Sequence, residues 1–200
     1  MTIVKQQSKA KPKPAQQVER LWFVPTIIPP PKWPRHFGDT EFEDKTADKI
    51  FKALKGDQAY VFHHENLSAT EGPSVWVFSA RWKNNGRIYR NIQDVSKVID
   101  DVSSQDESRL EHECLTNDVF FICGHGNRDE RCGDRGRRVL SAFKNKGCRA
   151  FACSHLGGHA FAGNVLQLPR AAWYSFVEDS NVDEILHNSF SSVYYRGSSW

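Results

Sequence analysis

The chain has 200 residues, 39% of them hydrophobic, and a formal net charge of +3, which predicts a globular protein with one substantial core or two small modules. No run of about 18 apolar residues is present, and the N-terminus lacks the apolar core of a secretion signal, so we expect an intracellular protein without a membrane span. The basic residues form no stripe interleaved with aromatic residues, so we expect no nucleic-acid partner.

The first 20 residues are predicted to form a flexible basic tail. Their excess of lysine resembles a mitochondrial targeting segment, but Pro12 and Pro14 interrupt any amphipathic helix there. After this tail we expect an N-terminal α/β segment over residues 21–112 and a second domain over residues 113–200.

In the first half of the chain, the proline-rich stretch at residues 29–34 predicts an extended connector and not a helix. The pair Asn85-Gly86 is a signal for a hairpin turn. Apolar spacing and β-rich runs predict helices over residues 47–54 and 95–102 and strands over residues 59–62 and 75–78. The sequence shows no internal repeat.

In the second half, residues 119–122 form a continuous apolar run, which predicts a buried strand that ends at Cys123. The other expected elements are a helix over about residues 135–146, a strand over 149–153, a hairpin of strands 165–168 and 173–177, and a helix around 182–190. Strand, helix, strand, hairpin and helix follow in this order in thioredoxin-like domains. The predicted fold class is therefore α/β, with a thioredoxin-like domain after a smaller α/β segment.

The chain has five cysteines, none of them in its first 113 residues. This is a poor layout for a disulfide scaffold and favours reduced thiols or metal ligands. The spacing Cys-x8-Cys, formed by Cys123 and Cys132, is followed by His-x3-His, formed by His155 and His159. Thiolate and imidazole together suit an iron–sulfur cluster or zinc. Glycines in both loops allow the backbone to bring the four side chains together.

Two motifs resemble the sucrase/ferredoxin-like family. They are Cys-Gly-His-Gly-Asn-Arg-Asp-Glu-Arg-Cys-Gly at residues 123–133 and Ser-His-Leu-Gly-Gly-His-Ala-Phe-Ala-Gly-Asn at residues 154–164, followed by Trp173-Tyr174. The resemblance is specific over about residues 117–177 and is closest to the actin patches distal group of the family. It implies a thioredoxin-like ferredoxin domain with a 2Fe-2S cluster held by Cys123, Cys132, His155 and His159.

The resemblance also implies a role in electron transfer or redox sensing, with unidentified donor and acceptor proteins, and it favours a non-enzymatic carrier over an enzyme. Imidazole in place of thiolate removes negative charge from a cluster, so we expect a reduction potential well above the roughly −400 mV of plant-type ferredoxins. Because imidazole titrates, we also expect that potential to fall with rising pH.

Two other functions stay open on the residues alone. A zinc-stabilised Cys2His2 binding module uses the same donors, although its first pair normally has two to four intervening residues. A thiol-disulfide oxidoreductase would use Cys123 and Cys132 as a dithiol, which leaves the histidine pair unexplained. We expect His125 to be a hydrogen-bonded loop residue and Cys153 a buried strand residue, not ligands.

The last residue, Trp200, resembles the C-terminal aromatic signal by which cytosolic and nuclear iron–sulfur proteins are recognised by their targeting machinery. On that basis we expect a cytoplasmic protein, with the mitochondrial matrix as the alternative location. Simple packing of Trp200 is the competing interpretation.

Overall fold

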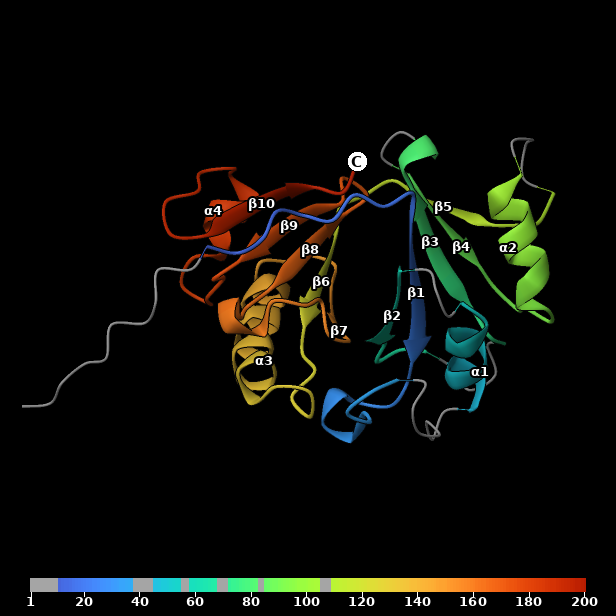
Figure 1. Cartoon of the computed structure of the whole chain (residues 1–200), viewed down its shortest axis with the longest axis horizontal. Coiled ribbons are helices and arrows are strands. Elements are labelled where there is room, and N and C mark those ends of the chain that lie inside the picture. The colour runs from blue at the N-terminus through green and yellow to red at the C-terminus, as the bar shows by residue number, and fades with distance from the viewer. Residues whose placement is uncertain (1–10, 38–44, 55–57, 68–71, 83–84, 105–108) are drawn as a thin grey trace, which may run out of the picture.

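The computed structural model describes residues 11–37, 45–54, 58–67, 72–82, 85–104 and 109–200, except for the side chain of His159. Within these ranges ten strands form one mixed sheet in the order β10-β9-β8-β6-β7-β2-β1-β3-β4-β5, with the helices on its outer sides (Figure 1). The predicted α/β class is confirmed.

The first half contains the predicted helices and strands. Its elements are β1 (Arg20–Thr26), η1 (Pro30–Lys32), α1 (Lys45–Ala53), β2 (Gln58–His63), β3 (Val75–Ser79), η2 (Ala80–Trp82), β4 (Gly86–Tyr89), α2 (Val95–Ser103) and β5 (Glu113–Leu115). β1 runs parallel to β2 and antiparallel to β3, and β4 pairs with β3 and β5. The proline-rich connector contains one 3-10 helix, η1, so the prediction that it has no helix is wrong at these three residues. The backbone angle that proline fixes suits extended chain but is also accepted in this turn.

The second half follows the predicted order from β6 to α4. Its elements are β6 (Val119–Cys123), α3 (Glu130–Asn145), β7 (Ala150–Cys153), η3 (His159–Phe161), β8 (Val165–Leu168), β9 (Ala172–Ser175), α4 (Val182–Leu186) and β10 (Tyr194–Ser198). β6 is parallel to β7 and antiparallel to β8, and β9 pairs with β8 and β10. α3 begins at Glu130, earlier than predicted, because the Asp129 carboxylate accepts a hydrogen bond from the Arg131 N–H and caps the helix.

The two halves share one topology, although the sequence shows no repeat. In each half, two parallel strands joined by a helix precede two antiparallel strands and a second helix. The halves join through a single antiparallel pair, Phe62 of β2 with Cys153 of β7. The repeat is thus one of architecture and not of sequence, because the halves build the same framework from different side chains.

The sheet bends sharply where the halves join. The rings of Phe23 in β1 and Phe121 in β6 stack with centroids 3.8 Å apart. In a flat sheet these strands, with two others between them, would lie about 14 Å apart. The inner faces of the two half-sheets therefore pack against each other around a shared aromatic core, while α1 and α2 cover one outer face and α3 and α4 the other (Figure 1).

Part of the predicted tail lies along the edge of the sheet. The N–H groups of Ala15 and Val18 donate to the carbonyl oxygens of Arg196 and Ser199, at 2.9 and 3.3 Å. Both side chains also pack against the shared aromatic core. Residues 15–18 are thus attached to β10, whereas residues 1–10 lie outside the described residues, and the domain boundaries stay predictions.

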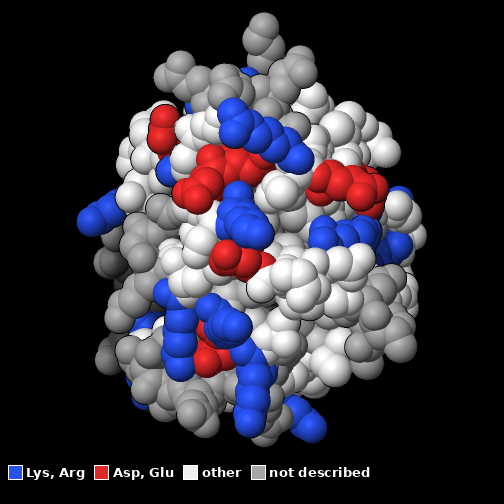
Figure 2. Space-filling model, turned by 90° about the vertical axis from the view of Figure 1, so that its right-hand side faces the viewer, with Lys and Arg blue, Asp and Glu red and all other residues white. Residues whose placement is uncertain are grey.

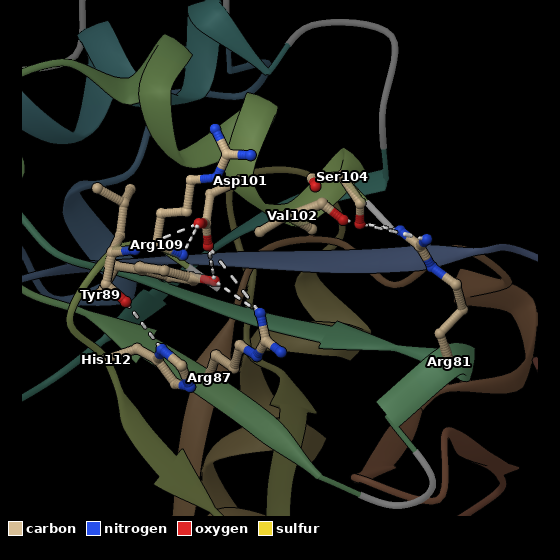
Figure 3. A network of polar contacts seen from close by, with 9 residues as sticks. Arg81, Arg87, Tyr89, Asp101, Val102, Ser104, Arg109 and His112 are labelled. Carbon is tan, nitrogen blue, oxygen red and sulfur yellow. Dashed lines mark hydrogen bonds and ion pairs between the residues drawn. The ribbon is translucent and has the colours of Figure 1, made fainter. Parts of the chain in front are cut away.

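A buried carboxylate organises the end of α2. Asp101 accepts hydrogen bonds from the Tyr89 hydroxyl at 3.0 Å and from the Arg109 N–H at 2.6 Å, and the Arg87 guanidinium lies 4.0 Å away (Figure 3). These contacts connect β4, α2 and the segment that follows α2. Because the buried charge has several donors around it, the network stabilises this corner of the first half.

Candidate metal centre

The cysteine loop starts at the end of a buried strand. All five residues of β6 are buried, and Cys123, two positions after Phe121, faces the shared aromatic core. The chain then turns back so that Cys132 lies in the first turn of α3. The strand and the helix therefore bring two cysteines nine positions apart in the sequence to one place.

Close backbone contacts fix this loop. A Cβ atom on Gly136 would lie 2.1 Å from the carbonyl oxygen of Cys123, and one on Gly133 would lie 2.6 Å from the Cα atom of Gly126. Only residues without a Cβ allow such approaches. α3 therefore packs directly on the backbone of β6 and of the cysteine loop.

A histidine completes the group of described donors. His155 follows β7, the parallel neighbour of β6, and its Nδ1 atom lies 3.7 Å from the Sγ atom of Cys123. The ligand atoms of Cys123, Cys132 and His155 all lie within 4.8 Å of one another. In the described ranges this is the one cluster of three or more side chains with metal-ligand spacing.

The fourth predicted ligand, His159, begins η3, and its side chain lies outside the described part of the structure. His125 is buried in the cysteine loop, and its Nε2 atom donates to the Pro34 carbonyl oxygen at 2.7 Å. Cys153 is buried at the end of β7. The predictions for His125, as a hydrogen-bonded loop residue, and for Cys153, as a buried strand residue, are confirmed.

The two clustered thiols differ in acidity. The hydrogen bond from Cys132 and the neighbouring His155 hold the pKa of Cys123 well below its usual range, although burial opposes them. The same hydrogen bond, together with burial, raises the pKa of Cys132. Burial also raises the pKa of Cys153. Cys123 is thus the readiest thiolate, and Cys132 must lose its proton for a cation to bind both sulfurs.

The sequence did not single out Asn164, which fixes the histidine loop. Its side-chain N–H groups donate to the carbonyl oxygens of Gly157 and Gly158 at 3.0 and 3.1 Å, and its Oδ1 atom accepts from the Ser175 hydroxyl at 2.6 Å. Its own carbonyl oxygen accepts from the Cys123 N–H at 3.0 Å. The only sequence signal was its place at the end of the second motif.

The donor set fits a soft metal group. Two sulfurs and an imidazole nitrogen suit zinc or an iron–sulfur cluster, and either would need one more ligand than the three described. A Cβ atom on Gly157 would meet nothing within 4 Å, so there is open space next to the loop at this residue. The fold and this cluster define an α/β protein with a cysteine–histidine group that could hold a metal. The chain belongs to the sucrase/ferredoxin-like family, whose profile it matches over residues 13–197.

Three similar curated proteins share one printed name, "Altered inheritance of mitochondria protein 32". Identity is 33% in each of three cases: over 93 residues in Meyerozyma guilliermondii, 91 in Candida glabrata and 75 in Saccharomyces cerevisiae. These matches cover 41%, 37% and 36% of this chain, and 33%, 29% and 24% of the relatives. The matched part thus spans a third or less of each relative. No solved structure gives a significant match.

Proposed function

We propose that the chain binds a 2Fe-2S cluster through Cys123, Cys132, His155 and His159 and works as an electron carrier or redox sensor. The observation that carries the proposal is that β6, α3 and the loop after β7 bring three of these donors within 4.8 Å of one another. His159, in the short helix four positions after His155, supplies the fourth donor in this proposal. A bound cluster of this kind takes up and releases single electrons.

The cysteine ligands and the histidine ligand of the proposed centre differ in their exposure to solvent. Both thiols are fully buried in the shared core, which keeps water away from the sulfurs. His155 is partly exposed. A partner protein can therefore approach the centre from the side of His155 and not from the side of the cysteines.

A thiol-disulfide oxidoreductase is the alternative that one observation favours. Cys132 lies in the first turn of a helix and donates a hydrogen bond to Cys123, an arrangement that stabilises a reactive thiolate. However, neither sulfur is exposed, so a protein disulfide could not reach them in this conformation. A zinc-stabilised module uses the same donors and is separated from our proposal by the identity of the metal.

Anaerobic purification of the full chain tests the proposal. We expect a red-brown protein that contains iron and acid-labile sulfide in equal amounts. C132A and H155A should lose iron and sulfide, whereas C153A, which removes a neighbouring buried cysteine outside the donor cluster, should retain them. A colourless wild-type protein with stoichiometric zinc would contradict the proposal.

The pH-dependent potential expected from histidine ligation is a separate part of the proposal. Redox titrations of the purified protein at several values between about pH 6 and pH 10 measure it. We expect the midpoint potential to fall as the pH rises. A midpoint potential that stays constant over this range would refute the coupling of reduction to proton uptake, but it would not refute the presence of a cluster.

For its partners, we propose unidentified electron donor and acceptor proteins. On the face that contains α1 and α2, positive and negative side chains alternate (Figure 2). A phosphate backbone there would meet carboxylates between the basic groups, which supports our expectation that nucleic acid is not a partner.

For its location, we propose the cytosol, with the mitochondrial matrix as the alternative. None of the helices in the described ranges has the length and apolarity needed to cross a bilayer. The printed name of the relatives favours the mitochondrial alternative. Trp200 packs partly against the shared aromatic core, so the targeting role proposed for it must coexist with packing. Subcellular fractionation of the tagged protein distinguishes the two compartments.

A further inference from the structure

We infer that Arg196 tunes the metal centre: the Nη1 atom of its guanidinium is buried against the histidine loop, where the side chain supplies a fixed positive charge beside the bound group. The inference rests on the proposed function, because it concerns the charge of a cluster at the same site. Arg196 lies in β10, far along the chain from both ligand motifs.

The guanidinium is held in place from two sides. Its Nε atom donates to the Lys13 carbonyl oxygen at 2.8 Å, and its central carbon lies 5.6 Å from the centre of the Trp173 ring. Arginine commonly stacks on aromatic rings in this way. The N-terminal segment and β9 therefore fix the position of this charge.

One nitrogen of the guanidinium lacks a hydrogen-bond acceptor among the residues that the structure describes. This Nη1 atom is buried, and none of those residues accepts a hydrogen bond from it. A buried N–H group without an acceptor costs about 1–3 kcal/mol, and more when the group is charged. An acceptor supplied by a bound group would remove that cost.

The same nitrogen faces the metal-binding loop. It lies 3.7 Å from the position that a Cβ atom on Gly158 would occupy, so it borders the turn between His155 and His159. Gly158 has a φ of +65°, a conformation that glycine adopts readily. The absence of a side chain there leaves the guanidinium close to the loop backbone.

The charges of Arg196 and of the cysteines both act on Tyr60, which packs against the shared aromatic core that contains the cysteines and Trp173. Burial and the nearby Cys153 and Cys123 raise the pKa of the Tyr60 hydroxyl, while the charge of Arg196 lowers it. Beside such a core water screens charges less than at an open surface, so a fixed positive charge acts over a longer range.

The consequence is a bias towards the reduced form of the centre. Reduction adds one negative charge, and a nearby positive charge stabilises the more negative state. Arg196 therefore raises the reduction potential relative to an uncharged side chain at this position. A purely structural role for Arg196 predicts no such change.

The test compares midpoint potentials of the cluster-loaded full-length proteins. R196M keeps the apolar stem on Trp173 but removes the charge, R196Q is a second neutral variant, and R196K keeps the charge. R170M is the matched control, because Arg170 is half exposed and pairs with Asp118 at 3.0 Å in the same half of the protein. Circular dichroism of the cluster-free forms identifies variants that fold.

We expect R196M and R196Q to lower the potential so that, at the wild-type midpoint, the ratio of reduced to oxidised protein falls about tenfold, which is about 59 mV for one electron. R196K and R170M should stay near the wild type. An unchanged potential in a folded neutral variant, or a shift in R196K as large as in R196M, would overturn the inference. A wild-type protein without iron and sulfide would instead refute the proposed function itself.

Discussion

The contact between α3 and β6 predicts a strong effect of a single methyl group. A Cβ atom on Gly136 would lie 2.1 Å from the Cys123 carbonyl oxygen, whereas carbon–oxygen contacts are ordinarily about 3.3 Å. The substitution G136A therefore forces the helix about 1.2 Å away from the strand. Such overpacking costs about 3 kcal/mol, and alanine regains about 1 kcal/mol through its helix propensity. We expect a net loss of about 2 kcal/mol in the free energy of unfolding.

Thermal denaturation followed by circular dichroism measures this loss. For a chain of this size it corresponds to a fall in Tm of about 4–8 °C. Because the movement separates Cys132 from Cys123, we also expect less bound metal per chain. S141A, at an exposed position of the same helix, is the control and should leave both quantities unchanged. If G136A kept the wild-type Tm and metal content, the close packing of α3 on β6 would be refuted.

Three further predictions concern other parts of the chain. Hydrogen bonds from residues 191–193 hold the pKa of Glu184 at about 2, so the ionised carboxylate stabilises the fold. E184Q should therefore lower Tm at pH 7, and the difference from wild type should shrink as the pH falls from its ordinary pKa of 4.5 towards 2. D101N should lower the free energy of unfolding by about 2 kcal/mol, because Tyr89 and the backbone donors lose a charged acceptor, and metal content should not change. W200A should lower metal occupancy in cells but not after chemical reconstitution of the purified protein.

Each of these predictions has a control and a contrary outcome. D179N and D100N change exposed carboxylates close in the sequence to Glu184 and Asp101 and should leave Tm near the wild-type value. A deficit for E184Q of equal size at pH 7 and pH 3 would show that its charge is not the cause. Loss of metal in D101N would show that the network in the first half reaches the metal centre. If W200A kept the wild-type metal occupancy in cells, the targeting role proposed for Trp200 would be refuted.

The sequence predicted the elements whose signal is local. β6 was predicted because a continuous apolar run is typical of a strand buried on both faces. β10 was missed because most of its residues are only partly buried, and it exists through pairing with β9 and contacts with residues 15–18. α4 ends at Leu186, before the predicted limit, since the chain beyond it turns back to donate hydrogen bonds to the Glu184 carboxylate.

In the candidate site too, some residues were predicted from the sequence and others were not. Cys123, Cys132 and His155 were predicted from spacing and motif, and the structure brings their donor atoms together. Asn164 and Arg196 were not predicted from the sequence, because their roles depend on neighbours that only the folded chain provides. Residue types that carry ligand chemistry are visible in a sequence, whereas the groups that position them are common residues without a distinctive pattern.

The shared topology of the two halves allows residues at equivalent positions to be compared. Phe62 and Cys153 occupy equivalent places, so Pro25, which pairs with Phe62, corresponds to Cys123, which pairs with Cys153. A proline thus stands where the first ligand would be in the other half. This is the arrangement that duplication of one ancestral unit leaves when only one copy keeps its chemistry. In the first half the chain after β1 instead contacts the cysteine loop of the second half, where the Pro34 carbonyl oxygen accepts a hydrogen bond from His125.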